Sequence, residues 1–208
     1  MSRNLKIIFS FIILIVGIII FGSEYFKEKK IMVYDYMNEL YYNEPINNND
    51  DISLNENNSG DKPDTSYSFN ENNESIYIGY LSIPKINLKK GFTKKDSPYN
   101  TISKNISILS ASDYPDTENG NVIFAAHSGN SSVSYFNKLH NLSVGDVVII
   151  EYNNIKYTYQ IGNIYEVPKT GEVEIKRYKD ISNVTLITCT KNNNETQTVY
   201  VGVLINKE

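Results

Sequence analysis

Two side chains of the sequence are suited to nucleophilic catalysis, and each follows a predicted strand. Cys189, the only cysteine, ends the alternating run 184–189 (Val-Thr-Leu-Ile-Thr-Cys) and opens a polar loop. His127, one of two histidines, comes directly after the apolar run 122–126. A thiolate can attack a carbonyl carbon, and an imidazole can move the protons of acyl transfer. The pair indicates a cysteine acyltransferase, against the alternative of a buried structural thiol and an ordinary histidine.

The N-terminal segment Leu5–Gly22 predicts where the rest of the chain lies. It is almost wholly apolar, with Lys6 and Ser10 as its only polar residues. As a helix it would be about 27 Å long, close to the hydrocarbon core of about 30 Å. Arg3 and Lys6 lie at its start, so the positive-inside rule predicts that residues 1–4 are cytoplasmic. The folded domain would then be extracellular and held at the cell membrane.

A cleaved signal peptide is the alternative interpretation of this segment. Its apolar region is longer than the core of a usual signal peptide, and no small-x-small cleavage site follows in residues 21–25. These two features favour an uncleaved anchor. Outside the cell a lone Cys189 cannot form an internal disulfide. Its place at the end of a strand therefore favours reactivity.

Composition divides the 208 residues into a stalk and a folded domain. The net charge is −4 and no basic stripe is visible, so we expect no nucleic-acid partner. Glu24–Tyr42 is charged and tyrosine-rich, and it could continue the anchor helix. Asn43–Ser75 is too polar to bury the apolar surface that ordering requires, and it is interpreted as a flexible tether. We assign residues 23–75 to an extracellular stalk and linker, and residues 76–208 to the domain.

The domain has the pattern of an all-β fold. From Ile76 onward, short runs rich in Val, Ile, Tyr and Thr are separated by turn residues. The only credible helix is short, at Ser132–Leu139. Many short strands at this spacing predict a closed or nearly closed β-barrel. The predicted strands are Tyr77–Ile83, Ile106–Leu109, Asn121–Ala126, Val147–Tyr152, Ile155–Val167, Glu172–Arg177, Val184–Thr188 and Thr198–Ile205.

Five parts of the domain resemble, in order, the motifs of the sortase family. They include a first-strand signature, a histidine motif ending in Ala-His-Ser and the motif Thr-Leu-x-Thr-Cys. The match runs from about Ile76 to Ile205, so it covers the whole predicted domain. The matching segments are Tyr80–Ile86, Asn121–Ser128, Phe136–Leu139 with Leu142–Asp146, Tyr157–Ile161 and Thr185–Thr190.

The resemblance implies a sortase-type closed eight-stranded β-barrel with one or two short helices, preceded by a transmembrane helix. Sortases are cysteine transpeptidases of Gram-positive bacteria that cleave surface proteins at a C-terminal sorting signal, often Leu-Pro-x-Thr-Gly. They pass the acyl group from a thioester to an amine of a cell-wall precursor or a pilin. The resemblance makes Cys189 the nucleophile and His127 the general acid and base. The short segment between Val167 and Thr185 has no room for the long helix of class B sortases.

One part of the family pattern is missing. Sortases normally carry an arginine on the last strand, roughly nine to thirteen residues after the cysteine, which orients substrate and stabilises the oxyanion. The only arginines here are Arg3 and Arg177, and both precede Cys189. Alignment on residues 199–201 places Gln197 or Thr198 at the arginine position.

Three interpretations of the missing arginine remain open. Gln197 can replace it, since an amide donates hydrogen bonds although it lacks the charge and the two-pronged geometry. A loop cation, Lys191 or Arg177, can reach the site instead. Finally, the domain can be weakly active or inactive, as a peptide-binding scaffold. A cysteine peptidase that uses water as acceptor is a further alternative.

The remaining candidates have simpler explanations. His140 lies in a polar turn, and we expect it to be solvated. Glu172 and Glu174 alternate beside two basic residues, which makes a poor oxygen cage for calcium, so we expect an exposed strand edge. Neither the residues nor the resemblance implies a metal or another cofactor.

Overall fold

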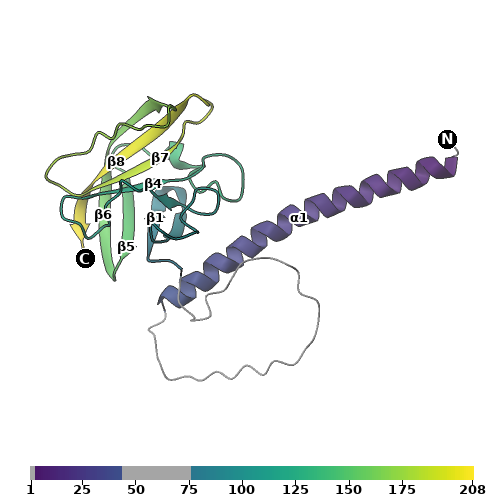
Figure 1. Cartoon of the computed structure of the whole chain (residues 1–208), viewed down its shortest axis with the longest axis horizontal. Helices are drawn as coiled ribbons and strands as arrows, with labels where there is room; N and C mark the ends of the chain where they lie inside the picture. Colours follow the sequence, from purple (N-terminus) through teal and green to yellow (C-terminus); the bar gives the residue numbers. More distant parts are fainter. Residues whose placement is uncertain (1–2, 44–75) are drawn as a thin grey trace, which may run out of the picture.

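The computed structural model describes residues 3–43 and 76–208, which form one long helix and a β-barrel (Figure 1). Helix α1 spans Arg3–Asn43, so the expected continuation of the N-terminal helix through Tyr42 is confirmed. Within the described residues, no helix has both the length and the hydropathy that crossing a membrane requires. Most of the predicted tether, residues 44–75, lies outside the described residues.

Eight strands form a single sheet that curls into a nearly closed barrel, in the order β2-β1-β5-β6-β8-β7-β4-β3. The two ends of the sheet are β2 and β3. The Asn105 side chain, just before β3, donates a hydrogen bond of 3.0 Å to the Gly91 carbonyl in β2 and bridges this seam. The strands are β1 (Gly79–Ile83), β2 (Leu88–Phe92), β3 (Ser107–Ile108), β4 (Asn121–Ala125), β5 (Val147–Tyr152), β6 (Ile155–Pro168), β7 (Asn183–Cys189) and β8 (Thr196–Lys207).

Seven of the eight predicted strands coincide with observed ones, and one prediction is wrong. Glu172–Arg177 lies in the irregular segment between β6 and β7. The Tyr165 hydroxyl accepts the Lys176 N–H at 2.7 Å and donates to the Glu174 carbonyl at 2.9 Å. One side chain thus satisfies backbone groups that a neighbouring strand would otherwise pair. The sequence missed β2, whose central Lys-Lys-Gly has no strand propensity of its own.

The predicted helix Ser132–Leu139 is also wrong. Tight turns fill this region, with the Ser134 N–H bonded to the Ser131 carbonyl at 3.0 Å. A short 3₁₀ helix, η2 (Leu139–Asn141), follows it, and a second, η1 (Pro84–Ile86), lies between β1 and β2. Phe136 and Leu139 are nevertheless fully buried. The apolar spacing of these residues correctly predicted that they are buried, but the backbone that buries them forms serine-rich turns rather than a helix.

Strands β4, β7 and β8 are apolar on both faces. Phe124, Leu186 and Tyr200 point into the main core of the barrel. The opposite face carries a second cluster, which we call the outer cluster: Ile123, Ile187, Val199 and Val201. Side chains from the segment after β6, including Val173 and Ile175, pack on this cluster. These three strands therefore have an interior face and a second, partly covered face.

Candidate active site

The parallel pairing of β4 with β7 brings His127 beside Cys189. Ala125 lies opposite Ile187 in the last pair of this register, and His127 and Cys189 each follow two residues later. Hydrogen bonds hold the chain to β7 beyond the end of β4. The Ala126 N–H donates to the Ile187 carbonyl at 3.3 Å. On the other side of His127, the Ser128 hydroxyl donates to the Cys189 carbonyl at 2.9 Å.

Thr188 adds a third bond at this place, from its hydroxyl to the Ala126 carbonyl at 2.8 Å. The residues on both sides of His127 are therefore bonded to residues 187–189. We did not predict these roles for Ser128 and Thr188, although both lie in the quoted motifs. The signal was a hydroxyl residue beside each candidate catalytic residue.

The antiparallel pairing of β7 with β8 places Gln197 directly opposite Cys189. Opposed residues in a sheet point to the same face, so Gln197 and Cys189 share the face of the outer cluster. Thr198 is one residue further and belongs to the opposite face, where its hydroxyl is 2.9 Å from that of Thr190. Cys189, His127 and Gln197 are all half-buried. Of the two residues that align with the family arginine, the strand register thus favours Gln197.

The two loop cations lie in different places. Arg177 donates a hydrogen bond to the Asn119 carbonyl, just before β4, at the end of that strand remote from His127. Lys191 lies in the β7–β8 loop, and its Nζ is 2.8 Å from Nε2 of His140. His140 is exposed, as expected, and its Nδ1 is 3.0 Å from the Asn137 carbonyl. Lys191 is therefore the cation that the fold holds nearer to the candidate site.

The outer cluster lies on the same face of β7 and β8 as Cys189 and Gln197 and is adjacent to them. Ile187 precedes Cys189 by two positions on the same face of β7, and Val199 follows Gln197 by two on β8. The segment after β6 covers this face through Val173 and Ile175. The apolar floor is thus covered further along the strands, whereas the end with Cys189 remains partly accessible.

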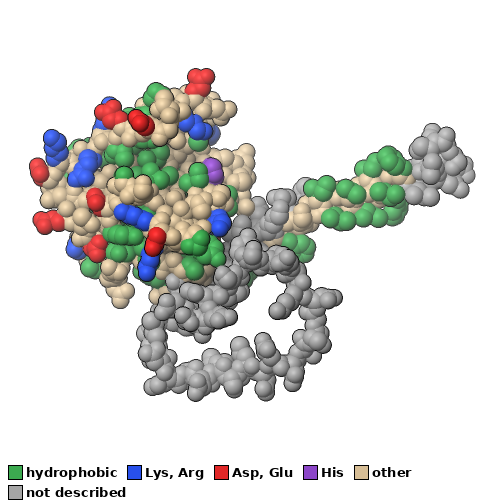
Figure 2. All heavy atoms as spheres, in the orientation of Figure 1, with side chains coloured by type: hydrophobic (Ala, Val, Ile, Leu, Met, Phe, Trp, Pro, Cys, Tyr) green, Lys and Arg blue, Asp and Glu red, His purple; other side chains and the backbone are tan. Residues whose placement is uncertain are grey.

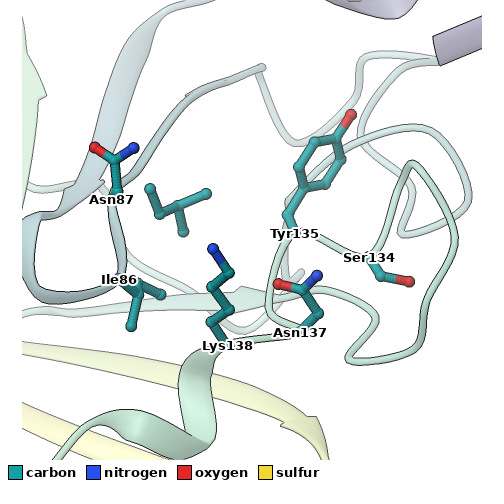
Figure 3. Close-up of a pocket in the computed structure, with 7 residues that line it drawn as sticks. Ile86, Asn87, Ser134, Tyr135, Asn137 and Lys138 are labelled. Atoms are coloured by element: carbon teal, nitrogen blue, oxygen red, sulfur yellow. The ribbon is translucent and has the colours of Figure 1, made fainter.

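A small pocket lies on another side of the segment that follows His127 (Figure 3). Its volume is about 230 Å³. In the close-up, the Lys138 amino group points into the space between Asn87 and Tyr135, whereas the Tyr135 hydroxyl points away from Lys138. The backbone here is tied to the candidate site, because the Phe136 N–H donates to the His127 carbonyl at 3.0 Å. The lining residues are Ile86, Asn87, Leu88, Ser134, Tyr135, Asn137 and Lys138.

The side chains that could ligate a metal ion are dispersed in the part of the chain that the structure describes. Within residues 3–43 and 76–208, no three His, Cys, Asp or Glu side chains form a group that could hold a metal ion. Glu172 and Glu174 are exposed but lie in the irregular segment after β6, not on the strand edge that we expected. The candidate site is thus a thiol, an imidazole and an amide.

Comparisons with known proteins show the family to which this fold belongs. The family model for the sortase domain matches residues 81–204. Sortase C1 from Streptococcus agalactiae has a similar structure, with 28% identity, a TM-score of 0.56, and coverage of 64% of this chain and 69% of that chain. Sortase A from Listeria monocytogenes has the same fold at 20% identity, with a TM-score of 0.54 and coverage of 64% and 90%.

A search of curated proteins found no match. The family match nevertheless covers more than half of the chain and includes both β4 and β7. The segment between β6 and β7, residues 169–182, contains no helix. This agrees with the expectation of a class other than B. The chain belongs to the sortase family.

Proposed function

We propose that this chain is a cysteine transpeptidase in which Cys189 and His127 perform both halves of acyl transfer. Members of the sortase family are cysteine transpeptidases, which supports the reaction class. The support for the assignment of residues is the parallel pairing of β4 with β7, since His127 and Cys189 each lie two residues beyond the last pair, Ala125 and Ile187. Both side chains are half-buried, so an extended peptide can reach them. The proposed donor is a surface protein with a C-terminal sorting signal.

The two half-reactions use the same pair in opposite directions. In the first, the Cys189 sulfur bonds to the scissile carbonyl carbon, and His127 donates a proton to the departing amine. The product is a thioester on Cys189. In the second, an acceptor amine attacks the thioester, His127 accepts its proton, and the sulfur leaves as the thiolate. The proposed acceptor is an amine of the cell wall or of a pilin.

We propose that Gln197 replaces the family arginine. Its amide can donate a hydrogen bond to the oxygen on which negative charge develops during each attack. The support is its place opposite Cys189 on the accessible end of β7 and β8. A neutral amide stabilises an oxyanion less than a guanidinium does. We therefore expect a slower enzyme than a sortase that carries the arginine.

We also propose that Leu5–Gly22 anchors the protein in the cell membrane with the barrel outside. The described side chains at residues 11–20 are all exposed and, apart from Gly17, hydrophobic (Figure 2). A helix that is apolar all round suits a hydrocarbon environment. The single thiol provides a test. Cys189 in intact cells should react with a membrane-impermeant thiol reagent, and protection of Cys189 until the cells are opened would contradict this orientation.

The function is tested with the full chain in detergent and a library of labelled peptides related to Leu-Pro-x-Thr-Gly. Each peptide is incubated with and without an amine acceptor, and the protein is examined by mass spectrometry. We expect a thioester adduct on Cys189 and a ligated product that requires the amine. Release of the cleaved peptide as a free carboxylic acid, without any need for the amine, would identify a peptidase. Binding without an adduct would identify a scaffold, and both outcomes contradict the proposal.

The chain supplies its own matched controls. Cys189→Ala should abolish the adduct, and retained turnover would exclude the mechanism. His127→Gln should remove activity, whereas His140→Gln, which changes the other histidine in an exposed turn, should leave it nearly unchanged. Equal losses in the two histidine variants would show that His127 has no special role.

A further inference from the structure

A buried lysine connects helix α1 to the first strands of the barrel. Lys90 in β2 is only 4% exposed, and lysine is almost never buried unless it is paired. Its ammonium group forms an ion pair with Asp35 of α1. Tyr77 completes the group. Its hydroxyl donates to the Asp35 carboxylate at 2.6 Å and accepts a hydrogen bond from Lys90 at 3.1 Å.

Burial and the Asp35 carboxylate shift the pKa of Lys90 in opposite directions. Burial lowers the pKa of the Lys90 ammonium, and the charge of Asp35 and its hydrogen bond oppose this shift. Burial, followed by the charge of Asp35, raises the pKa of Tyr77. The Asp35 carboxylate is therefore the group that keeps a cation in this place. Without Asp35, the ammonium form of Lys90 would have no counter-ion at a position where the lysine is almost fully buried.

A second ion pair in the same interface is exposed. Lys89, the neighbour of Lys90, pairs with Glu39, one helical turn after Asp35. The two side chains are 47% and 36% exposed, and pairs of this kind contribute little. The same helix and the same strand thus supply two lysine–carboxylate pairs that differ in the burial of the lysine, whose side chain is 5% exposed in one pair and 47% in the other, whereas the carboxylate side chains are similarly accessible at 34% and 36%. This difference makes the exposed pair a matched control for the buried one.

The buried pair reaches the segment that carries a bond to His127. The Lys90 Nζ lies 4.6 Å from the centre of the Tyr135 ring, within the range of a cation–π contact. The next residue, Phe136, is fully buried, and its N–H donates to the His127 carbonyl at 3.0 Å. A continuous series of contacts therefore runs from Asp35 through Lys90 and Tyr135 to the backbone of His127.

We propose that Asp35 and Lys90 are positioning residues for His127, so that helix α1 helps to fix the geometry of the active site. The docked helix keeps Lys90 charged and in place against Tyr135, and the segment 135–136 in turn fixes the His127 carbonyl. Neither residue touches the reacting atoms. The inference rests on the proposed role of His127, and it adds that the catalytic domain extends beyond the barrel into α1.

Nuclear magnetic resonance of the full chain in detergent tests this inference without relying on turnover. The chain has two histidines, so the His140→Gln background leaves a single imidazole signal, that of His127. In this background Asp35→Asn should shift or broaden the His127 signal, whereas Glu39→Gln should leave it unchanged. The rate of Cys189 alkylation should fall about tenfold in Asp35→Asn, since small displacements in a site are costly. An Asp35→Glu variant, which restores the charge, should recover most of this rate.

A double variant separates positioning from stability. Asp35→Asn alone should lower the Tm by about 5 °C or more, because it leaves Lys90 buried without its counter-ion. Adding Lys90→Met removes that charge and should restore most of the Tm. Lys90→Met also removes the cation–π contact with Tyr135, so we expect the His127 signal and the alkylation rate to remain perturbed in the double variant.

Two results would overturn the inference. One is recovery of the alkylation rate together with the Tm in the double variant. The other is an unchanged His127 signal in Asp35→Asn. Failure of the proposed function is distinguishable from both. A wild-type protein without ligated product, but with a His127 signal that responds to Asp35→Asn, would contradict transpeptidation and leave the positioning role supported.

Discussion

The two faces of strand β7 differ in what they contact. Leu186 and its neighbours in alternate positions face the main core, where Leu186 is fully buried. Ile187 faces the small outer cluster, and Cys189, two residues later on that face, is half-buried at the end of the strand. One strand therefore has a face enclosed by the barrel and a face that becomes accessible towards its end.

This difference shows how a small barrel can position a nucleophile on a strand without replacing a residue of its main core. The interior face makes the contacts on which stability depends, and its hydroxyl at Thr188 bonds to the Ala126 carbonyl beside His127. The outer face then presents Cys189 half-buried at the end of the strand. If this separation is real, substitutions on the two faces should affect different measurements.

The largest expected effect is the contrast between Leu186→Ala and Cys189→Ala. Leu186→Ala should lower the free energy of unfolding by about 2–5 kcal/mol, because it leaves a cavity in the main core. Cys189→Ala should abolish the thioester adduct and change the free energy of unfolding by less than about 1 kcal/mol. Urea unfolding and adduct formation measure the two quantities. A large loss of stability in Cys189→Ala would make Cys189 a structural thiol.

Gln197 provides the next test, since it and Thr198 lie on opposite faces of β8. Gln197→Ala should lower kcat/KM about 100-fold, the lower end of the loss seen when one amide donor of an oxyanion hole is removed. Thr198→Val is the matched control and should have a much smaller effect on kcat/KM. Gln197→Arg, which restores the family residue, should raise kcat/KM above that of the natural chain.

The loop cation is tested in the same assay. Lys191 bonds to His140 rather than to a residue of the candidate site, so Lys191→Ala should reduce kcat/KM less than Gln197→Ala does. The reverse order would assign oxyanion stabilisation to the β7–β8 loop. Either order decides between two of the interpretations that the missing arginine leaves open.

A smaller effect is expected where the outer face is covered. Ile175 packs on the outer cluster from the segment after β6. Ile175→Ser should loosen that cover and raise KM about threefold with kcat nearly unchanged, because it alters binding rather than the reacting groups. Exposed Ile102→Ser is the control, and it should change neither constant. A fall in kcat for Ile175→Ser would mean that the cover also positions Cys189.

The sequence predicted the parts of the fold that rest on local pattern. The strand β5 was predicted with its observed bounds, and both catalytic candidates were placed at the ends of runs that are strands. The failures depend on tertiary contacts. β2 is a strand because it pairs with β1, although its Lys-Lys-Gly centre is unfavourable. Glu172–Arg177 alternates like a strand, yet Tyr165 takes its hydrogen bonds.

The candidate site was predictable only in part for the same reason. Motifs identified Cys189 and His127, but the choice between Gln197 and Thr198 required the register of β7 with β8. Alignment alone leaves a one-residue ambiguity, and one residue in a strand is a change of face. The contact of Asp35 with Lys90 joins residues that are 55 positions apart, on either side of the linker, and no local sequence pattern predicts it.

The smallest expected effect concerns a contact away from both faces of β7. Asp146, in the turn before β5, accepts hydrogen bonds from Lys85 at 2.7 Å and from the Ser143 N–H at 2.6 Å. The hydrogen bond from Lys85, together with that from Ser143, lowers the pKa of Asp146. The stabilisation is therefore fully present above the ordinary pKa of about 3.9 and is lost as the pH falls through the lowered native value.

Asp146→Asn should accordingly lower the free energy of unfolding by about 0.5 kcal/mol at neutral pH, a small amount because the pair is accessible to water. The difference from the natural chain should shrink as the pH falls from neutral to an acid value at which Asp146 is protonated in the folded and the unfolded chain alike. Urea unfolding at the two pH values measures it. Adduct formation on Cys189 should not change, because Asp146 bonds to Lys85 and Ser143 rather than to a residue of the candidate site. A parallel loss of adduct formation in Asp146→Asn would contradict this expectation.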